Sequence, residues 1–155
     1  MSNEYVIYRL KNYMKDNNST KLFTDFSQLY EDDFMHERGF ECKDGWFDLI
    51  YDLSSSLQKQ ENASEIRVSQ VKQKMGHLVY RVKNLTDEIN KIITQTQNKA
   101  KETCEMCGSD NSVLNMCKRH YIVLCKYCSS LGNNAYDCVT YEEYSKKMEN
   151  QWKLE

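Results

Sequence analysis

Two Cys-x-x-Cys pairs constrain the fold of this chain more than any other feature. They are Cys104-Glu-Met-Cys107 and Cys125-Lys-Tyr-Cys128, and 17 residues separate them. Each pair can present two sulfurs on one tight turn, and two such turns supply the four thiolates of a tetrahedral zinc site. Gly108 follows the first pair directly and suits a turn in which backbone amides face the sulfurs. The spacing therefore predicts one structural zinc ion per chain, held by Cys104, Cys107, Cys125 and Cys128.

Three further residues are possible alternative ligands. Cys117 and His120 lie between the pairs and Cys138 lies ten residues beyond the second pair, so each could substitute as a ligand. Four thiolates already close a structural site, whereas catalytic zinc keeps an open coordination position. We therefore expect these three residues to be spares, Cys42 to be a lone core thiol, and the protein not to be an enzyme.

Sequence signals for membranes and secretion are missing from the chain. There is no run of about 18 apolar residues, and the first residues lack a basic region followed by an apolar stretch. We expect a protein of the cytosol that has no membrane partner. In that reducing compartment, cysteines are expected as metal ligands and free thiols rather than as disulfides.

Hydrophobic periodicity predicts an α+β fold in which helices predominate. Leu, Ile, Val and Phe supply only 32 of the 155 residues, so the core should be small and should need help from a metal or a partner. Residues 1–103 form the expected α+β domain, and residues 104–155 form the expected zinc-knuckle module with a C-terminal helix. The predicted helices cover about 4–15, 24–36, 45–60, 86–102 and 141–153.

A β-hairpin is predicted over about 66–83, because apolar residues alternate on both sides of Gly76. A lone hairpin is marginally stable, so it must pack on helices. Its core side should carry Ile66, Val68, Leu78, Tyr80 and Val82. Three helices have a start signal in the sequence, namely Asp44, Asn84 and the capping box Thr140-Tyr-Glu-Glu143.

Charge is unevenly distributed, although the formal net charge is only −2. Residues 1–64 sum to −5, residues 65–128 to +5 and residues 129–155 to −2. The acidic part offers a partner-binding face that could imitate the phosphates of a nucleic acid. Its members are Glu31, Asp32, Asp33, Glu37, Glu41, Asp44, Asp48 and Asp52. The plain alternative is a solvated helix surface.

The basic middle of the chain offers a nucleic-acid-binding surface. Its candidates are Arg67, Lys72, Lys74, Arg81 and Lys83 on the hairpin, and Lys118, Arg119 and Lys126 on the zinc module. Tyr121 and Tyr127 lie near the second group, and cations beside aromatic rings suit phosphate contact and base stacking. The plain alternative is again a solvated surface.

Three stretches together resemble an uncharacterised family of small proteins found mainly in bacteriophages and prophages. They are Gly39-Phe-Glu-Cys-Lys-Asp-Gly-Trp-Phe-Asp-Leu-Ile50, Gln70-Val-Lys-Gln-Lys-Met-Gly76 leading into Leu78 and Tyr80, and Cys104-Glu-Met-Cys-Gly108. Val79 stands where the family usually has Arg. The resemblance covers residues 39–128. It implies a phage origin, residence in the cytosol of an infected bacterium and an accessory role.

These observations lead to a non-enzymatic interaction protein as the expected function. A phage product of this kind would bind a host protein complex, such as a CRISPR or other immunity effector or the transcription machinery, and inhibit or redirect it. A zinc-stapled nucleic-acid-binding protein is the alternative. A homodimer is also possible, because the helices at 45–60 and 86–102 could each find a partner.

A nuclease of the His-Asn-His type is a more remote alternative. The phrase Arg119-His-Tyr-Ile-Val-Leu-Cys125 faintly resembles such enzymes. Their site needs a general-base His with a second His or Asn that holds a catalytic metal. His120 lacks such a neighbour, and Asn115 is poorly placed to be one.

Overall fold

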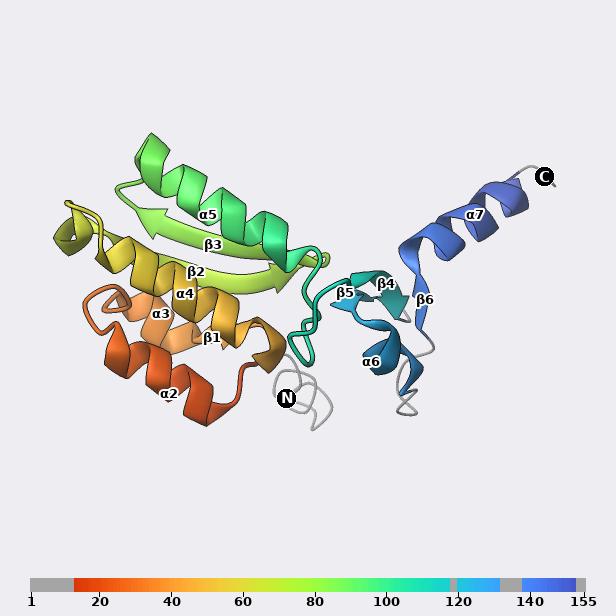
Figure 1. Ribbon diagram of the computed structural model, residues 1–155, viewed down its shortest axis with the longest axis horizontal. Helices are drawn as coiled ribbons and strands as arrows, with labels where there is room; N and C mark the ends of the chain where they lie inside the picture. Colours follow the sequence, from red (N-terminus) through yellow and green to blue (C-terminus); the bar gives the residue numbers. More distant parts are fainter. Residues whose placement is uncertain (1–12, 118–119, 132–137, 153–155) are drawn as a thin grey trace.

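The computed structural model describes residues 13–117, 120–131 and 138–152. It contains six α-helices and two three-stranded sheets, so the predicted α+β class is confirmed. A larger body holds the first sheet and most of the helices, a smaller module lies at one end of it, and the last helix extends beyond the module (Figure 1). Within the described residues, no helix is both long and apolar enough to cross a membrane.

The first sheet contains the predicted hairpin. β2 (Arg67–Lys74) and β3 (His77–Lys83) pair antiparallel, and the short β1 (Phe40–Glu41) adds to β2 in parallel. Met75 and Gly76 form the turn with φ values of 51° and 78°, and a type I′ hairpin requires positive φ at both positions. The hairpin is therefore confirmed. The edge strand β1 was not predicted, because two residues are too few to show a period.

A bulge decides which side chains of β2 face the core. The register shifts between Val68 and Gln70, so Val71 rather than Gln70 is the next buried residue. The predicted core side is otherwise confirmed: Ile66, Val68, Leu78 and Tyr80 are buried, and Val82 is half-buried. A strict two-residue period in the sequence cannot reveal the extra residue of a bulge.

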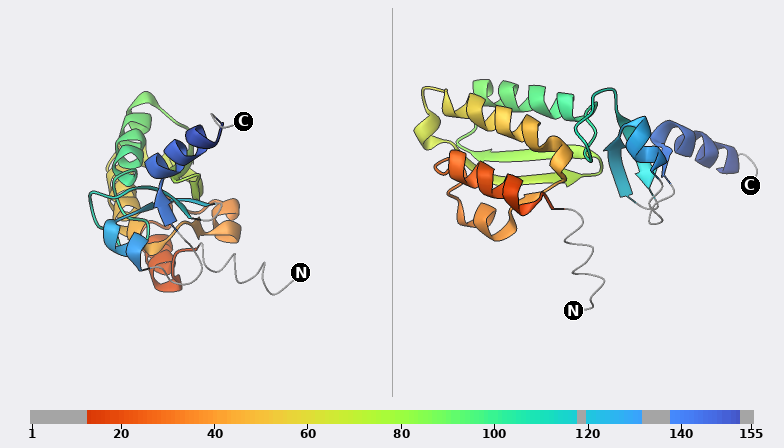
Figure 2. Two further views of the ribbon diagram at one scale, coloured as in Figure 1. Left: turned by 90° about the vertical axis from the view of Figure 1, so that its right-hand side faces the viewer. Right: turned by 60° about the horizontal axis from the view of Figure 1, so that its bottom comes forward.

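Two helices cover the inner face of this sheet. α4 (Phe47–Gln58) packs against α5 (Asp87–Ala100), and α5 lies along β3 (Figures 1 and 2). Their apolar sides, which could have served a homodimer, are covered within the chain. Leu53 and Ile93, for example, belong to the same buried core.

The starts of both helices differ from the predicted caps. Thr86, and not Asn84, caps α5 by accepting a hydrogen bond from the backbone N–H of Ile89. A 3₁₀ turn, η1 (Asp44–Trp46), precedes α4, so Asp44 is not the residue that caps it. The Asp44 carboxylate instead accepts hydrogen bonds at the start of the first described helix, from the backbone N–H of Lys15 and the side-chain amide of Asn18. A second 3₁₀ turn, η2 (Ala63–Glu65), leads into β2.

The helix predicted over 24–36 is wrong. Helix α2 (Asp16–Asp25) ends near the start of this range, and α3 (Asp33–Arg38) begins only near its end. The turn between them buries Phe26, Leu29 and Tyr30, so apolar spacing that resembles a helix is satisfied by a turn packed on the core. Asp32 then caps α3 by accepting a hydrogen bond from Phe34 N at 3.0 Å.

Residues 4–12 of the helix predicted over 4–15 lie outside the described residues, and residues 13–15 are not helical.

The module has a second sheet that was not predicted. Its strands are β4 (Val113–Cys117), β5 (His120–Leu124) and β6 (Cys138–Thr140), in the order β5-β4-β6. α6 (Lys126–Ser130) follows β5, and α7 (Tyr141–Trp152) follows β6. These strands are short, and two of them contain cysteines, so the sequence shows no clear alternation of apolar and polar residues that would predict them.

The capping box at the start of α7 is confirmed. The backbone N–H of Glu143 donates to Thr140 Oγ1 at 3.2 Å, and the backbone N–H of Thr140 donates to Glu143 Oε2 at 3.0 Å. The last predicted helix therefore begins where its sequence signal places it.

Candidate metal centre and charged surfaces

The four cysteines of the two pairs converge on one point. Their sulfur atoms all lie within 4.8 Å of one another, and Cys107 Sγ is 3.7 Å from Cys125 Sγ. A tetrahedral site with metal–sulfur bonds of about 2.3 Å places its sulfurs about 3.8 Å apart. The donor set therefore fits a metal ion bound by four thiolates.

Backbone geometry shapes both turns around the sulfurs. Gly108 has a φ of 79°, and its N–H donates to the Cys104 carbonyl at 2.8 Å, which closes the first turn. The N–H of Cys128 points at Cys125 Sγ at 3.4 Å, at the start of α6. A positive φ favours glycine at this position. The backbone amides of Met106 and Cys107 interact with the Cys104 sulfur, so the predicted turn with amides facing a sulfur is confirmed.

The thiols of the cluster have strongly different proton affinities. Burial raises the pKa of Cys104, although nearby backbone amides partly offset the effect. The Ser109 hydroxyl, whose Oγ is 3.0 Å from Cys107 Sγ, lowers the pKa of Cys107 to about 6. Burial and the neighbouring thiols hold the pKa of Cys128 far above its usual range. A divalent cation at this point would stabilise all four groups as thiolates.

The spare cysteines are not free thiols, which corrects the prediction made from a reducing compartment. Cys117 and Cys138 face each other on β4 and β6, with Cα atoms 4.2 Å apart, and form a disulfide. They therefore do not belong to the ligand set. The sequence separation of 21 residues gave no sign of this pairing, because β6 itself was not predicted. His120 is exposed on β5 and is not part of the cluster.

Cys42 is a buried free thiol of the body, as expected. Burial raises its pKa well above the usual range.

The first metal turn is docked on the body of the protein. A Cβ atom at Gly45 would lie 2.2 Å from the Cys104 carbonyl oxygen and 2.5 Å from that of Glu105. The Gly45 N–H donates to the Glu105 carbonyl at 2.9 Å, and the Trp46 indole N–H donates to the Thr103 carbonyl at 2.9 Å. Only glycine leaves room for this close approach of two backbones. We call these contacts the joint.

Glu105 is a buried carboxyl group at the joint that was not predicted. It lies between the two cysteines of the first pair and is only 3% exposed. Burial raises its pKa to about 7, against the opposing effect of Lys43. Its Oε1 accepts a hydrogen bond from the Lys43 N–H at 3.4 Å. The sequence around Glu105 gives no sign of this burial, because the burial results from a contact between segments that are far apart in the sequence.

The predicted acidic face is divided in the structure. Glu31, Asp32, Glu41 and Asp44 form ion pairs with basic side chains. Four other members of the predicted set form no ion pair among the described residues: Asp33 and Glu37 on α3, and Asp48 and Asp52 on α4. Part of the set thus stabilises the fold, and partner binding by the rest remains a prediction.

The basic set of the hairpin is also divided. Arg67 Nε lies 2.6 Å from Glu31 Oε1, and Lys83 Nζ lies 2.5 Å from Asp32 Oδ2. Lys72, Lys74 and Arg81 form no ion pair within the described part of the chain. Lys126 is exposed at the start of α6, and the predicted Lys118 and Arg119 lie outside the described residues.

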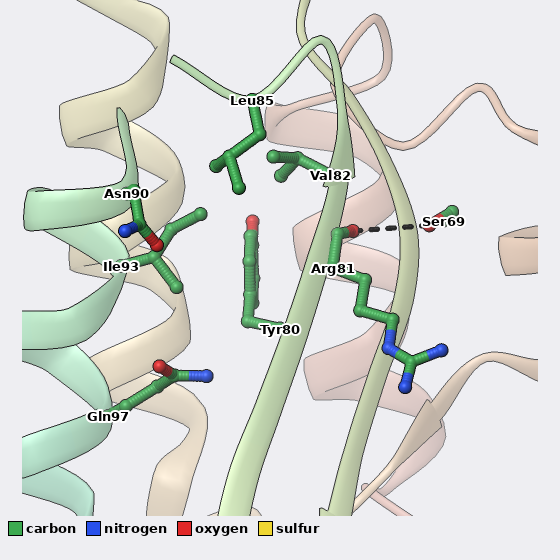
Figure 3. Close-up of a pocket in the computed structure, with 8 residues that line it drawn as sticks. All are labelled: Ser69, Tyr80, Arg81, Val82, Leu85, Asn90, Ile93 and Gln97. Atoms are coloured by element: carbon green, nitrogen blue, oxygen red, sulfur yellow. Dashed lines mark hydrogen bonds between the residues drawn. The ribbon is translucent and has the colours of Figure 1, made fainter. Parts of the chain in front are cut away.

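A shallow pocket of about 270 Å³ lies between β3 and α5 (Figure 3). It is lined by Ser69, Tyr80, Arg81, Val82, Leu85, Asn90, Ile93 and Gln97. Burial raises the pKa of Tyr80 to about 12, and its hydroxyl lies 3.0 Å from that of Tyr30. The lining contains no carboxyl, imidazole or thiol group that could act as a general acid or base.

No family model, curated protein or solved structure matches the chain. The resemblance to small phage proteins therefore remains a prediction. The three stretches that carry it meet around the joint. Gly45 of the first stretch packs on Cys104 of the third, and Gly76 of the second stretch approaches the Leu114 side chain of the module. Gln73 of the second stretch also donates to the Tyr121 carbonyl of the module.

Proposed function

We propose that the four-cysteine centre binds one structural zinc ion. The fit between the sulfur separations and a tetrahedral thiolate site supports this assignment, as does the preference of zinc for sulfur ligands. Four protein ligands leave no open position, so the ion would stabilise the module rather than activate a substrate.

Native mass spectrometry tests the assignment. The purified chain should carry about one zinc ion, and Cys42→Ala should retain it because Cys42 lies outside the cluster. A chain that is folded and carries no zinc would contradict the proposal.

We also propose that the protein is a non-enzymatic interaction protein that binds a host protein complex through its zinc module, and inhibits or redirects that complex. One observation carries this proposal. Six of the nine exposed large hydrophobic side chains of the described residues belong to the module, which is about a third of the chain. They are Met106, Val113, Tyr127, Leu131, Val139 and Tyr141. Exposed apolar side chains that gather in one region mark interaction sites.

Tyr127 and Leu131 are the best anchors among these six residues. They are four residues apart along α6 and its C-terminal end, so they share one face of the helix. Their side chains are 68% and 49% exposed. Tyrosine is enriched among the residues that dominate binding energy in protein interfaces. The resemblance to small phage proteins, itself a prediction, implies a partner in the cytosol of an infected bacterium, with immunity effectors and the transcription machinery as target classes.

Affinity capture from bacterial lysate tests this function. The tagged protein should retain a host protein in a stoichiometric amount after nuclease treatment. Tyr127→Ser with Leu131→Ser should abolish that capture. The control is Phe34→Ser with Leu85→Ser, which changes two comparably exposed hydrophobic residues of the body. Recovery of nucleic acid alone, or equal capture by both double variants, would contradict the proposal.

A further inference from the structure

The outward side of the hairpin carries a separate positively charged surface. In the register of β2 and β3, the pairs Gln70–Arg81, Lys72–Val79 and Lys74–His77 alternate with the pairs that point toward the helices. Figure 3 shows Tyr80 directed toward α5 and Arg81 directed away from it. We call these six outward residues the basic face.

The basic face is open at the end nearest the module and closed at the other end. Val79, at its centre, is only half-buried and is not among the residues that pack against the core. At the far end, α3 lies against β2, and the residues just before α3 neutralise Arg67 and Lys83. The positive charge of the hairpin is therefore concentrated on Lys72, Lys74 and Arg81.

The nearest acidic neighbour on the sheet does not cancel this charge. Glu41 on β1 is aligned with Lys72, but its carboxylate is engaged elsewhere. It accepts a hydrogen bond from the Tyr13 hydroxyl at 3.3 Å and lies 3.9 Å from an Arg38 nitrogen. The three cations of the basic face thus remain available to a partner of opposite charge.

The composition of the basic face indicates which polyanion it fits. Single-stranded nucleic acids are held by aromatic platforms on which bases stack. Apart from the imidazole of His77, the six side chains include no ring on which a base could stack. Successive outward residues of one strand are about 7 Å apart, so the cations form a row rather than a point. A row of cations without a stacking platform suits the phosphates of a duplex, which it contacts without reading the sequence.

We propose that the basic face binds the phosphate backbone of double-stranded nucleic acid through Lys72, Lys74 and Arg81. This activity is independent of the protein partner proposed for the module. It also separates the hairpin cations into three that contact phosphate and two, Arg67 and Lys83, that hold the fold.

Fluorescence anisotropy with a labelled duplex of about 20 base pairs tests the proposal on the zinc-loaded full chain. Binding should weaken with salt, with a slope of log K against log salt near −2.7, because three phosphates contribute about −0.9 each. Changing Lys72, Lys74 and Arg81 together to Ala should weaken binding by about tenfold or more at 50 mM salt and flatten the slope. Duplexes of unrelated sequence should bind equally.

Matched variants distinguish a specific role of the basic face from a general effect of net charge and from a loss of folding. Arg67→Ala with Lys83→Ala removes two cations of the same hairpin and should change affinity by no more than about twofold at equal zinc content. The charge-preserving triple variant K72R/K74R/R81K should bind as the wild type does, and so should the module variant Y127S/L131S. Absence of duplex binding at 50 mM salt, an equal loss in the Arg67 and Lys83 control, or tighter binding of a single strand than of the duplex would each overturn the proposal.

Discussion

The body and the module are stabilised by different means. Among the described residues, the body and Val123 of the module share one core of 22 buried residues, in which Trp46 and Tyr30 are fully buried. In the described part of the module, a separate core contains three buried residues, and two of them are cysteines. A region with so little apolar burial needs cross-links to fold. The described structure supplies one disulfide and four converging thiols in the module.

The joint connects the body to the module. Gly45 belongs to the body and touches the backbone of the metal turn, while the Trp46 side chain is fully buried and donates its indole N–H to Thr103. Order in the metal turn should therefore influence the adjacent end of the body, whereas the rest of the body has its own source of stability. Variants that alter only the body or only the module test this division.

The largest effect is expected at the metal cluster. Cys104→Ser removes the fully buried thiol of the four-cysteine cluster, so a module that depends on the proposed zinc ion should lose its metal and its order. The binding free energy at stake is on the order of 10 kcal/mol. Zinc content and the dispersion of NMR signals from β4 and β5 measure the loss. Retention of ordered β4 and β5 in a metal-free Cys104→Ser protein would show that the module does not depend on the ion.

A core truncation in the body should destabilise the body and leave the zinc content of the module unchanged. Leu53 is 2% exposed on α4, so Leu53→Ala should lower the free energy of unfolding by about 2–5 kcal/mol through lost burial and a cavity. Chemical denaturation monitored on the body measures this change. Zinc stoichiometry should stay at its wild-type value in native buffer, and loss of zinc from a folded variant would contradict the division of roles.

The disulfide should act on the module alone. Cys138→Ser opens a link between residues 21 apart in sequence, which stabilises such a region by about 3 kcal/mol. Hydrogen exchange should become faster in β6 and α7, because β6 connects α7 to the sheet. Zinc content should not change, since neither Cys117 nor Cys138 belongs to the cluster. A fall in zinc content would restore Cys138 as a candidate ligand.

The smallest of these effects is expected at the joint. Gly45→Ala would place a Cβ atom 2.2 Å from a backbone oxygen, and the resulting shift should cost about 1–3 kcal/mol. Gly39→Ala is the matched control, because no atom lies within 4 Å of the place its Cβ would take and only its φ of 66° opposes the change. Gly45→Ala should also weaken zinc retention, whereas Gly39→Ala should not. Equal effects on zinc would show that the joint does not couple the regions.

The features that depend on neighbouring residues were predictable from the sequence. The hairpin turn at Gly76, the turn at Gly108 and the capping box at Thr140 each follow from a few neighbouring residues, and all three are confirmed. The convergence of the four cysteines was also predictable, because their spacing reflects the geometry of the ligand set.

The features that were missed depend on contacts between distant segments. The disulfide requires the pairing of β4 with β6, and the burial of Glu105 requires the docking of the metal turn on the body. The division of the basic residues was invisible for the same reason. Arg67 and Arg81 look alike in the sequence, but Arg67 pairs with Glu31, which is distant in the sequence.

Hydrogen exchange of the purified wild-type chain, with and without a zinc chelator, tests the central claim most directly. After chelation, the amides of β4 and β5 should lose their protection, while those of β2, β3 and α4 should keep it because their core is independent of the metal. Within the body, a partial loss of protection is expected only near Gly45 and Trp46 at the joint. Protection of β4 and β5 that persists without metal, or loss of protection in the whole body at the same chelator concentration, would contradict the account.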